Sequence, residues 1–124
     1  DDGRMLLHTI LTYQWQQMPA LGIKLTMRDV RFARFIGTEI FPGGWLPTPQ
    51  TVGEYAVTAG FELTRVHSLQ LHYARTLETW AANKDAAIAI QSQEVYDRYM
   101  KYLTGCAKLF RQGYTDVDQF TLQK

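Results

Sequence analysis

The chain has 124 residues, a length that accommodates one hydrophobic core and one domain. Its hydrophobic content of 46%, charged content of 20% and net charge of +1 are those of an ordinary soluble protein, and they argue against a protein that binds nucleic acid through charge alone. One cysteine, Cys106, excludes an internal disulfide and is compatible with a reducing compartment.

Signals for targeting and for metal binding are missing from the sequence. The first apolar run, from Met5 to Leu11, is short and is interrupted by His8, so we identify no signal peptide. No apolar stretch is long enough to cross a membrane. His8, His67 and His72 lack carboxylate or thiolate neighbours at the spacing of metal ligands. We therefore expect a cytoplasmic protein without a metal centre.

The first third of the chain predicts a strand followed by a helix. Residues 4–10 are apolar with little alternation, which is typical of a buried strand with neighbours on both edges, as in a parallel sheet. Residues 12–25 show no clear periodicity and are interpreted as a flap. Residues 27–41 carry an apolar stripe at helical spacing, although Gly37 weakens the pattern, and Pro42 ends the predicted helix.

Three arginines, Arg28, Arg31 and Arg34, recur at intervals of three beside this apolar stripe. Such a row of charges is most simply a solvated helix face. It is also compatible with a docking patch for an acidic carrier protein or for anionic lipid headgroups. The sequence alone leaves both interpretations open.

A second helix and a second strand follow. Thr51 and Glu54 have the spacing of a capping box, which predicts a helix that begins at Thr51 and ends at Gly60. Residues 61–68 predict the next strand. A helix, a glycine and then a strand follow one another in the usual manner of an α/β sheet.

The junction between this strand and the next helix places a phenol at a prominent position. From Tyr73 onward the apolar residues switch to helical spacing, with Tyr73, Leu77 and Trp80 on one face. Tyr73 is thus the first inward-facing residue of the predicted helix, and its hydroxyl is presented where the strand ends. For this residue alone, a core tyrosine with its hydroxyl bonded to the backbone is the simpler interpretation.

The last third of the chain predicts a helical hairpin and a closing strand. Residues 87–90 fit a short helical segment, and Ser92 is placed to cap a long helix that ends near Gly113. Residues 116–124 predict an edge strand, which we expect to pair antiparallel with residues 61–68. The predicted fold class is therefore α/β, half of a doubly wound sheet with an inserted helical hairpin.

Four blocks of sequence carry a resemblance that covers essentially the whole chain. They are MLLHTI at residues 5–10, EIFPGG at 39–44, LHYARTL at 71–77 and EVYDRYMKYLTGC at 94–106. In this order they resemble the mycolic acid methyltransferases, which include the mycobacterial cyclopropane mycolic acid synthases and belong to the cyclopropane-fatty-acyl-phospholipid synthase superfamily. The resemblance covers only the C-terminal part of the family's chain, less than half of it.

The resemblance implies part of a class I, Rossmann-like methyltransferase that depends on S-adenosylmethionine. Residues 1–124 would form one partial domain, with a helical insertion over a lipid pocket at about 72–113. Members of the family transfer the sulfonium methyl group to a cis double bond of a long mycolic acyl chain, carried on acyl carrier protein, and give cyclopropane or methyl-branched products. Bicarbonate is implied as the base that closes the ring, and peripheral membrane association is compatible with such a substrate.

Seven residues match functional positions of the family. His8 and Tyr73 match two residues that hold the bicarbonate, and both side chains are suitable donors to an anion in a dry site. The remaining five match residues that line the acyl pocket: Phe41, Leu77, Tyr102, Cys106 and Phe110. The resemblance thus implies that Cys106 lines the pocket and is not a nucleophile.

Three functional elements of the family have no match in this chain. They are the glycine-rich loop for the cofactor, the acidic residue for its ribose and the glutamate that completes the bicarbonate site. We therefore expect the isolated chain to be inactive and to act as part of a complete enzyme. The alternatives are a catalytically inactive lipid-binding remnant and an unstable product with an exposed strand edge.

Overall fold

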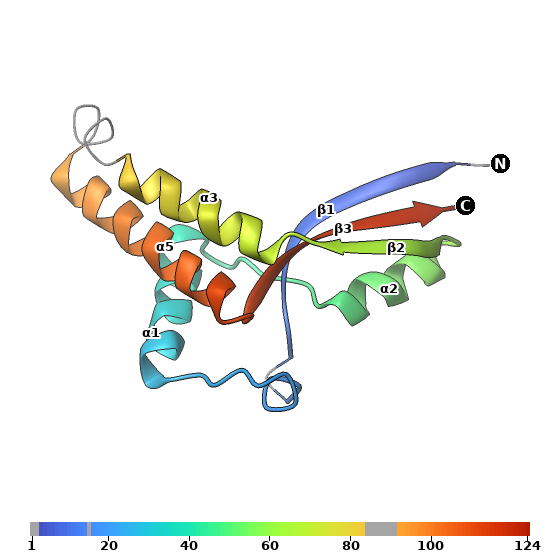
Figure 1. The fold of residues 1–124 in the computed structure, drawn as a ribbon, viewed down its shortest axis with the longest axis horizontal. Coiled ribbons are helices and arrows are strands. Elements are labelled where there is room, and N and C mark those ends of the chain that lie inside the picture. The colour runs from blue at the N-terminus through green and yellow to red at the C-terminus, as the bar shows by residue number, and fades with distance from the viewer. Residues whose placement is uncertain (1–2, 15, 84–91) are drawn as a thin grey trace.

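The protein is described by a computed structural model that covers residues 3–14, 16–83 and 92–124. At its centre is a three-stranded antiparallel sheet in the order β1-β3-β2 (Figure 1). The strands are β1 (Arg4–Thr12), β2 (Glu62–Ser68) and β3 (Thr115–Gln123). Because β3 pairs antiparallel with both neighbours, β1 and β2 run in the same direction on either side of it.

The pairing register arranges side chains in rows across the sheet. His8, Gln119 and His67 form one row, and Leu7 and Phe120 belong to the next. Since side chains alternate along a strand, these two rows project from opposite faces. The face that carries Leu7 and Phe120 is called the packed face below, and the face that carries His8 and Gln119 is called the histidine face.

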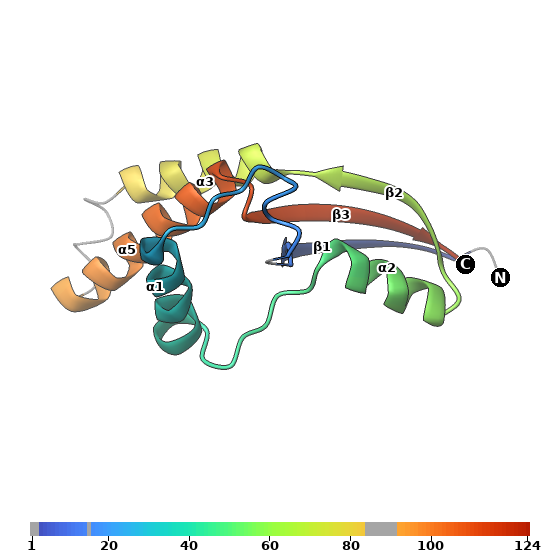
Figure 2. The ribbon, with the colours of Figure 1, turned by 90° about the horizontal axis from the view of Figure 1, so that it is seen from below.

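Helix α2 (Pro49–Thr58) covers the packed face (Figure 2). Its buried residues Val52 and Ala56 lie one turn apart, so they point to the same side of the helix. They pack into a core that includes Leu11 and Phe120, both with 0% exposure. In the part of the chain that the structure describes, no helix covers the histidine face over the length of α2 (Figure 2).

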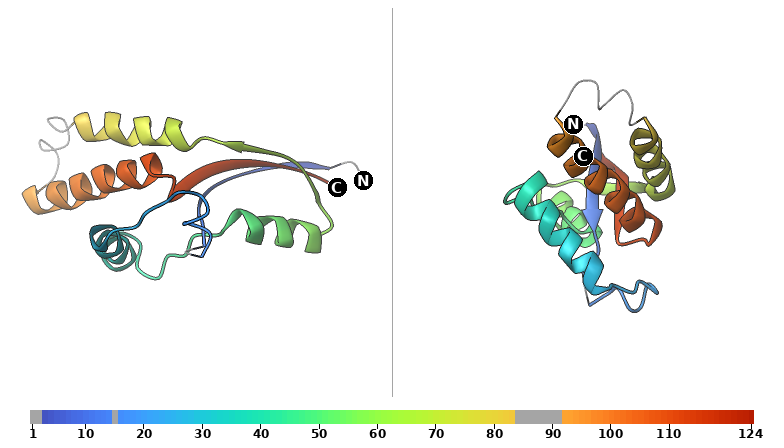
Figure 3. Two further views of the ribbon diagram at one scale, coloured as in Figure 1. Left: turned by 60° about the horizontal axis from the view of Figure 1, so that its bottom comes forward. Right: turned by 90° about the vertical axis from the view of Figure 1, so that its left-hand side faces the viewer.

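A helical hairpin extends from one end of the sheet, whereas β1 begins and β3 ends at the other (Figure 1). Its helices are α3 (Gln70–Ala82) and α5 (Gln93–Arg111), which lie side by side (Figure 3). Arg111 binds both carboxylate oxygens of Glu78 across the pair, at 2.9 and 2.7 Å. Buried residues of both helices and of β3 form a second core: Ala74, Leu77, Ala107, Phe110 and Val117.

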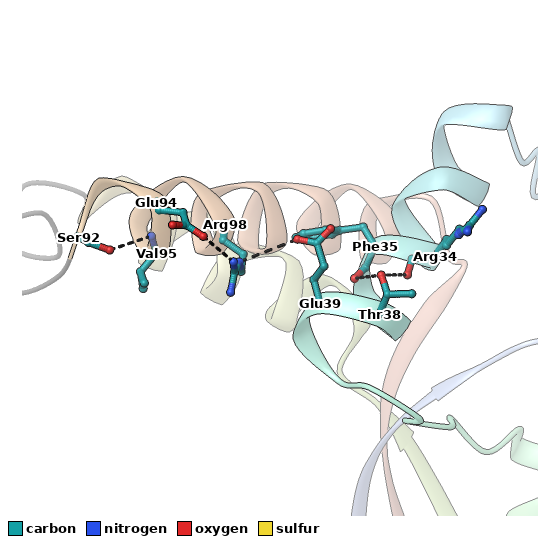
Figure 4. Close-up of polar contacts among 8 residues, drawn as sticks. All are labelled: Arg34, Phe35, Thr38, Glu39, Ser92, Glu94, Val95 and Arg98. Carbon is teal, nitrogen blue, oxygen red and sulfur yellow. Dashed lines mark hydrogen bonds and ion pairs between the residues drawn. The ribbon is translucent and has the colours of Figure 1, made fainter.

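Helix α1 (Met27–Phe35) continues into a short π-helix, η1 (Ile36–Ile40), and this segment crosses α5. Figure 4 shows one contact of this crossing, where Arg98 lies 3.9 Å from Glu39 and also binds Glu94 of its own helix at 2.9 Å. The contacts join residues of the two segments in reverse chain order: Asp29 with Lys108, Phe32 with Gly105, Phe35 with Lys101 and Glu39 with Arg98.

Several predicted features are confirmed. The last strand pairs antiparallel with β2, as expected. Ser92 caps α5, because its hydroxyl accepts a hydrogen bond from the Val95 N–H (Figure 4). Gly113 follows the end of this helix with a φ of 75°, a backbone conformation that glycine adopts without strain. Residues 16–26 contain no helix or strand, in agreement with the irregular segment predicted there.

One prediction about the strands is wrong. The last strand is not an edge strand, because β3 lies between β1 and β2. The first strand pairs antiparallel with β3 along one edge, and most of its residues are exposed in the described part of the protein, so a parallel neighbour on its other edge stays a prediction. An apolar composition predicts that a strand packs against something, but it does not specify the direction of the neighbouring strand.

Two predicted helix boundaries also differ from the structure. The second helix begins at Pro49, and Thr48 is its cap, accepting the Thr51 N–H at 3.1 Å. Proline suits the first helical position because its missing N–H would have no partner there. The predicted helix over residues 27–41 is α-helical only to Phe35, and π-helical beyond it.

The predicted helical segment at residues 87–90 lies outside the described residues. None of the described helices combines the length and the apolar character needed to cross a membrane.

Candidate functional site

His8 and Tyr73 meet on the histidine face of the sheet. His8 lies in the middle of β1, and Tyr73 lies in the first turn of α3, 65 positions further along the chain. The His8 Nε2 and Tyr73 Oη atoms are 2.9 Å apart, which is a hydrogen-bond distance, and the two ring centroids are 5.8 Å apart. The two side chains that the resemblance places around one anion therefore converge.

The first turn of α3 is tied to its surroundings by two short hydrogen bonds. The Leu69 N–H donates to the Val117 carbonyl of β3 at 2.8 Å. The Gln70 Nε2 donates to the Phe110 carbonyl of α5 at 2.6 Å. Because this turn is bound to both β3 and α5, it holds the Tyr73 ring over the sheet.

Gln119 is a third polar member of this group, and no sequence pattern predicted its role. Its Nε2 lies 3.3 Å from the His8 Nδ1. With the amide nitrogen as the donor, Nδ1 is the unprotonated nitrogen of the neutral imidazole, and Nε2 carries the hydrogen that is donated to the Tyr73 oxygen. The hydrogen of the Tyr73 hydroxyl is then available to another acceptor. Only the register of β1 against β3 reveals this role, since Gln119 otherwise resembles any polar residue of a strand.

An apolar wall continues from Tyr73 into the hairpin. The Tyr73 ring centroid lies 5.9 Å from that of Phe110, which is buried. Leu77 is buried in the same core, and both Tyr73 and Cys106 pack against that core. Three of the five predicted acyl-pocket residues are thus joined to the His8–Tyr73 pair by direct packing.

The remaining two predicted pocket residues are Tyr102 and Phe41. Tyr102 lies one helical turn before Cys106 on α5, and its ring meets the Phe41 ring at a centroid distance of 5.8 Å and an angle of 80°. Burial raises the pKa of the Cys106 thiol to about 12, although the Tyr102 side chain acts in the opposite direction. Burial also raises the pKa of Tyr102. A thiol with such a pKa is protonated at neutral pH and is therefore a poor nucleophile.

The seven predicted residues thus follow one another from the sheet along the hairpin, and none of them lines the two cavities described next. One cavity of about 320 Å³ lies between α1 and α5, and another of about 380 Å³ lies between α3 and α5. Neither is lined by a predicted site residue. The acyl pocket therefore stays a prediction. Within the described ranges, no cluster of three His, Cys, Asp or Glu residues could hold a metal ion.

The packed face carries a buried acidic pair at the start of β3. Asp116 and Asp118 are 3% and 4% exposed. Asp116 accepts hydrogen bonds from the Ser68 hydroxyl and from the Val117 N–H, both at 2.6 Å. Burial, and then the charge of Asp116, raise the pKa of Asp118 to about 6. This pair projects from the opposite face to His8, so it is separate from the candidate site.

Comparison with known proteins gives the same family as the four sequence blocks. The mycolic acid cyclopropane synthetase family matches residues 1–120. Cyclopropane mycolic acid synthase 3 of Mycobacterium tuberculosis is 67% identical over 127 aligned positions, which cover 99% of this chain and 44% of that protein. The chain therefore spans less than half the length of this curated relative.

Two solved structures extend the comparison to the fold. The cyclopropane synthase MmaA2 from Mycobacterium tuberculosis has 61% sequence identity and a TM-score of 0.92, over 99% of this chain and 45% of that one. The mycolic acid cyclopropane synthase CmaA1, in complex with SAH and CTAB, has 55% identity and a TM-score of 0.89, with the same coverage. The mixed helices and strands described above are thus part of an α/β methyltransferase fold, and the chain belongs to the mycolic acid cyclopropane synthase family.

Proposed function

We propose that this chain is the C-terminal part of an enzyme that transfers the methyl group of S-adenosylmethionine to a cis double bond of a long mycolic acyl chain. The product would be a cyclopropane or a methyl branch. Family membership supports methyl transfer as the activity of the whole protein. For this segment, the observation that carries the proposal is the 2.9 Å contact between His8 and Tyr73.

The polar group on the histidine face fits a small oxyanion such as bicarbonate. When His8 donates through Nε2, the Tyr73 hydroxyl hydrogen is left to bind an anion, and Gln119 favours this arrangement from the other side of the imidazole. Bound bicarbonate would supply the base that removes a proton from the transferred methyl group. His8 and Tyr73 would hold that anion and fix its orientation.

Methyl transfer to an alkene also requires a dry, shaped site, because an alkene is a weak nucleophile that must be held in line with the sulfonium. We propose that Phe41, Leu77, Tyr102, Cys106 and Phe110 line the acyl chain near the reacting bond. Their packing supports this role. The aromatic faces would also stabilise the positive charge that develops on the alkene carbon.

The delivery of the substrate is part of the same proposal. A long acyl chain is insoluble as a free acid, so we propose that it arrives on an acyl carrier protein. A cytoplasmic location and a peripheral association with membranes stay predictions.

The test uses the native protein, whose intact mass is determined first. Calorimetry measures S-adenosylmethionine binding, and mass spectrometry measures conversion of a cis-unsaturated acyl substrate. Tyr73→Phe should lower kcat about 10²- to 10³-fold, because it removes a donor to the anion, and should leave cofactor affinity unchanged. Tyr55→Phe removes the same hydroxyl from an exposed tyrosine of α2 and should change kcat less than twofold.

Full activity of Tyr73→Phe would contradict the proposed role of the anion site. If the native protein does not bind S-adenosylmethionine at all, the inactive lipid-binding alternative replaces the proposed activity.

A further inference from the structure

The cavity between α1 and α5 is strongly basic, although the net charge of the chain is only +1. Its volume is about 320 Å³, and it includes none of the seven predicted site residues. Among its lining residues, four are cationic and one is anionic. These charged residues are Arg28, Arg31, Lys101, Lys108 and Asp29.

Helical spacing brings the cations to opposite walls of the same space. Arg28 and Arg31 lie three residues apart on one side of α1. Lys101 and Lys108 lie seven residues apart, two turns, on one side of α5. Each helix therefore contributes two positive charges to the cavity.

One of the four cations is already paired. Lys108 Nζ donates to Asp29 Oδ1 at 2.6 Å, while the Thr26 N–H and hydroxyl donate to Asp29 Oδ2. The bond from Lys108 is the main reason that the pKa of Asp29 is lowered to about 2, so this carboxylate is charged at neutral pH. The other three cations form no ion pair with any carboxylate of the described ranges. Three positive charges are therefore available to a ligand.

Packing between the helices holds the walls in place. Lys101 Nζ lies 3.8 Å from the centre of the Phe35 ring, a cation–π contact. The Phe32 ring lies directly against Gly105, where an added Cβ would come within 2.1 Å of a ring atom. Glycine at this position allows the close approach, and Phe32 gives the cavity an apolar surface beside the charges.

We propose that this cavity binds the phosphate group of a small organic phosphate ester. Guanidinium groups bind phosphate oxygens in pairs, and a lysine adds a point charge. Three unpaired cations suit a phosphate dianion, and Phe32 offers contact to the organic part of the ester. Cations that converge into a hollow enclose a single phosphate, whereas a bilayer surface is matched by cations on an outward face. The inference is independent of methyl transfer, because phosphate binding is measured without S-adenosylmethionine.

The test is a titration of the native, ¹⁵N-labelled protein with inorganic phosphate and with butyl phosphate in a phosphate-free buffer. We expect saturable changes of the amide signals of α1 and α5, and tighter binding of butyl phosphate because of Phe32. Arg31→Glu should weaken both ligands at least tenfold. Arg34→Glu makes the same change one turn later on α1, outside the cavity lining, and should change affinity less than twofold. Figure 4 shows the Arg34 side chain directed away from the contact between Arg98 and Glu39.

A second variant distinguishes loss of charge from a folding defect caused by Arg31→Glu. Arg31→Gln combined with Lys101→Gln removes two of the three available charges without reversing any, and should also weaken binding at least tenfold. Lys108 is left unchanged, because its loss would strand the buried Asp29 carboxylate without its partner.

Three results would overturn the proposal. The first is an absence of saturable signal changes in α1 and α5. The second is equal weakening by Arg31→Glu and Arg34→Glu. The third is binding to vesicles that contain phosphatidylglycerol without binding of either phosphate compound, which would assign the cations to a membrane surface.

Discussion

On the packed face of the sheet, Leu11 and Phe120 are completely buried beneath α2, whereas on the histidine face Leu6 and Ile10 are 60% and 39% exposed. The same strands supply both faces, and their apolar residues are similar in kind. The difference lies in what covers them: α2 closes the packed face, while the described part of the histidine face is met only at one end, by the hairpin (Figure 2).

The histidine face also carries a row of polar side chains. A helix laid across His8, Gln119 and His67 would take three polar side chains out of water, and each would require a new partner. Tyr73 supplies such a partner for His8 at the end of the row. His8 is therefore the member of this row that is paired with a residue of the hairpin.

The largest expected effect is a difference in the free energy of unfolding between substitutions on the two faces. Phe120→Ala should lower the free energy of unfolding by about 3 to 5 kcal/mol, because it leaves a cavity in the closed core. Leu6→Ala on the histidine face should cost less than about 1 kcal/mol, because that side chain is mostly in contact with water. Urea unfolding of both variants measures the difference. Similar losses would show that the two faces are equally well packed.

Most of the fold was predictable from local patterns. The apolar runs located all three strands, and Ser92 and Gly113 marked the ends of α5. The central position of β3 was not predictable, because a strand's own sequence does not specify which strands lie on its two edges. The start of α2 was misplaced because Thr48 and Thr51 are both suitable caps, and Pro49 decides between them.

Less of the candidate site could be predicted from local sequence patterns. His8 and Tyr73 lie 65 positions apart, so no spacing rule joins them, and they were paired through the family resemblance alone. Gln119 was missed because its role depends on the register of β1 against β3. Only part of the basic cavity could be predicted from the sequence. The spacing of Arg28 and Arg31 indicated a row of charges, but Lys101 lies near them only because α1 crosses α5.

A smaller effect, confined to the histidine face, is expected for Gln119→Leu. Without the amide donor, the preference for the tautomer with its hydrogen on Nε2 should be lost, and the imidazole should populate both neutral tautomers. We expect kcat to fall about tenfold, equivalent to about 1.4 kcal/mol, with little change in stability. The ¹⁵N chemical shifts of the His8 ring report the tautomer directly.

Gln119→Glu provides the matched comparison for this variant, since it keeps the length of the side chain and removes the donor. Both variants should move the His8 ring shifts. Unchanged shifts in both would show that Gln119 does not set the tautomer.

The smallest expected effect concerns a polar exception on the packed face, the Asp118 carboxyl, whose pKa is raised from 3.8 to about 6 by burial and by Asp116. Between these values the unfolded chain loses the proton that the folded chain retains. The stability that this carboxyl contributes is therefore complete below about pH 4 and is lost as the pH rises through 6. Asp118→Asn should remove that loss and stabilise the protein by about 1 kcal/mol at pH 7.5, after allowance for screening by water, with no gain at pH 4. Urea unfolding at both pH values measures this gain in stability.

Asp116→Asn is the control variant. It should destabilise the protein, because it weakens the hydrogen bonds donated by the Ser68 hydroxyl and the Val117 N–H. A gain for Asp118→Asn that is the same at both pH values would mean that the buried carboxyl is not the cause.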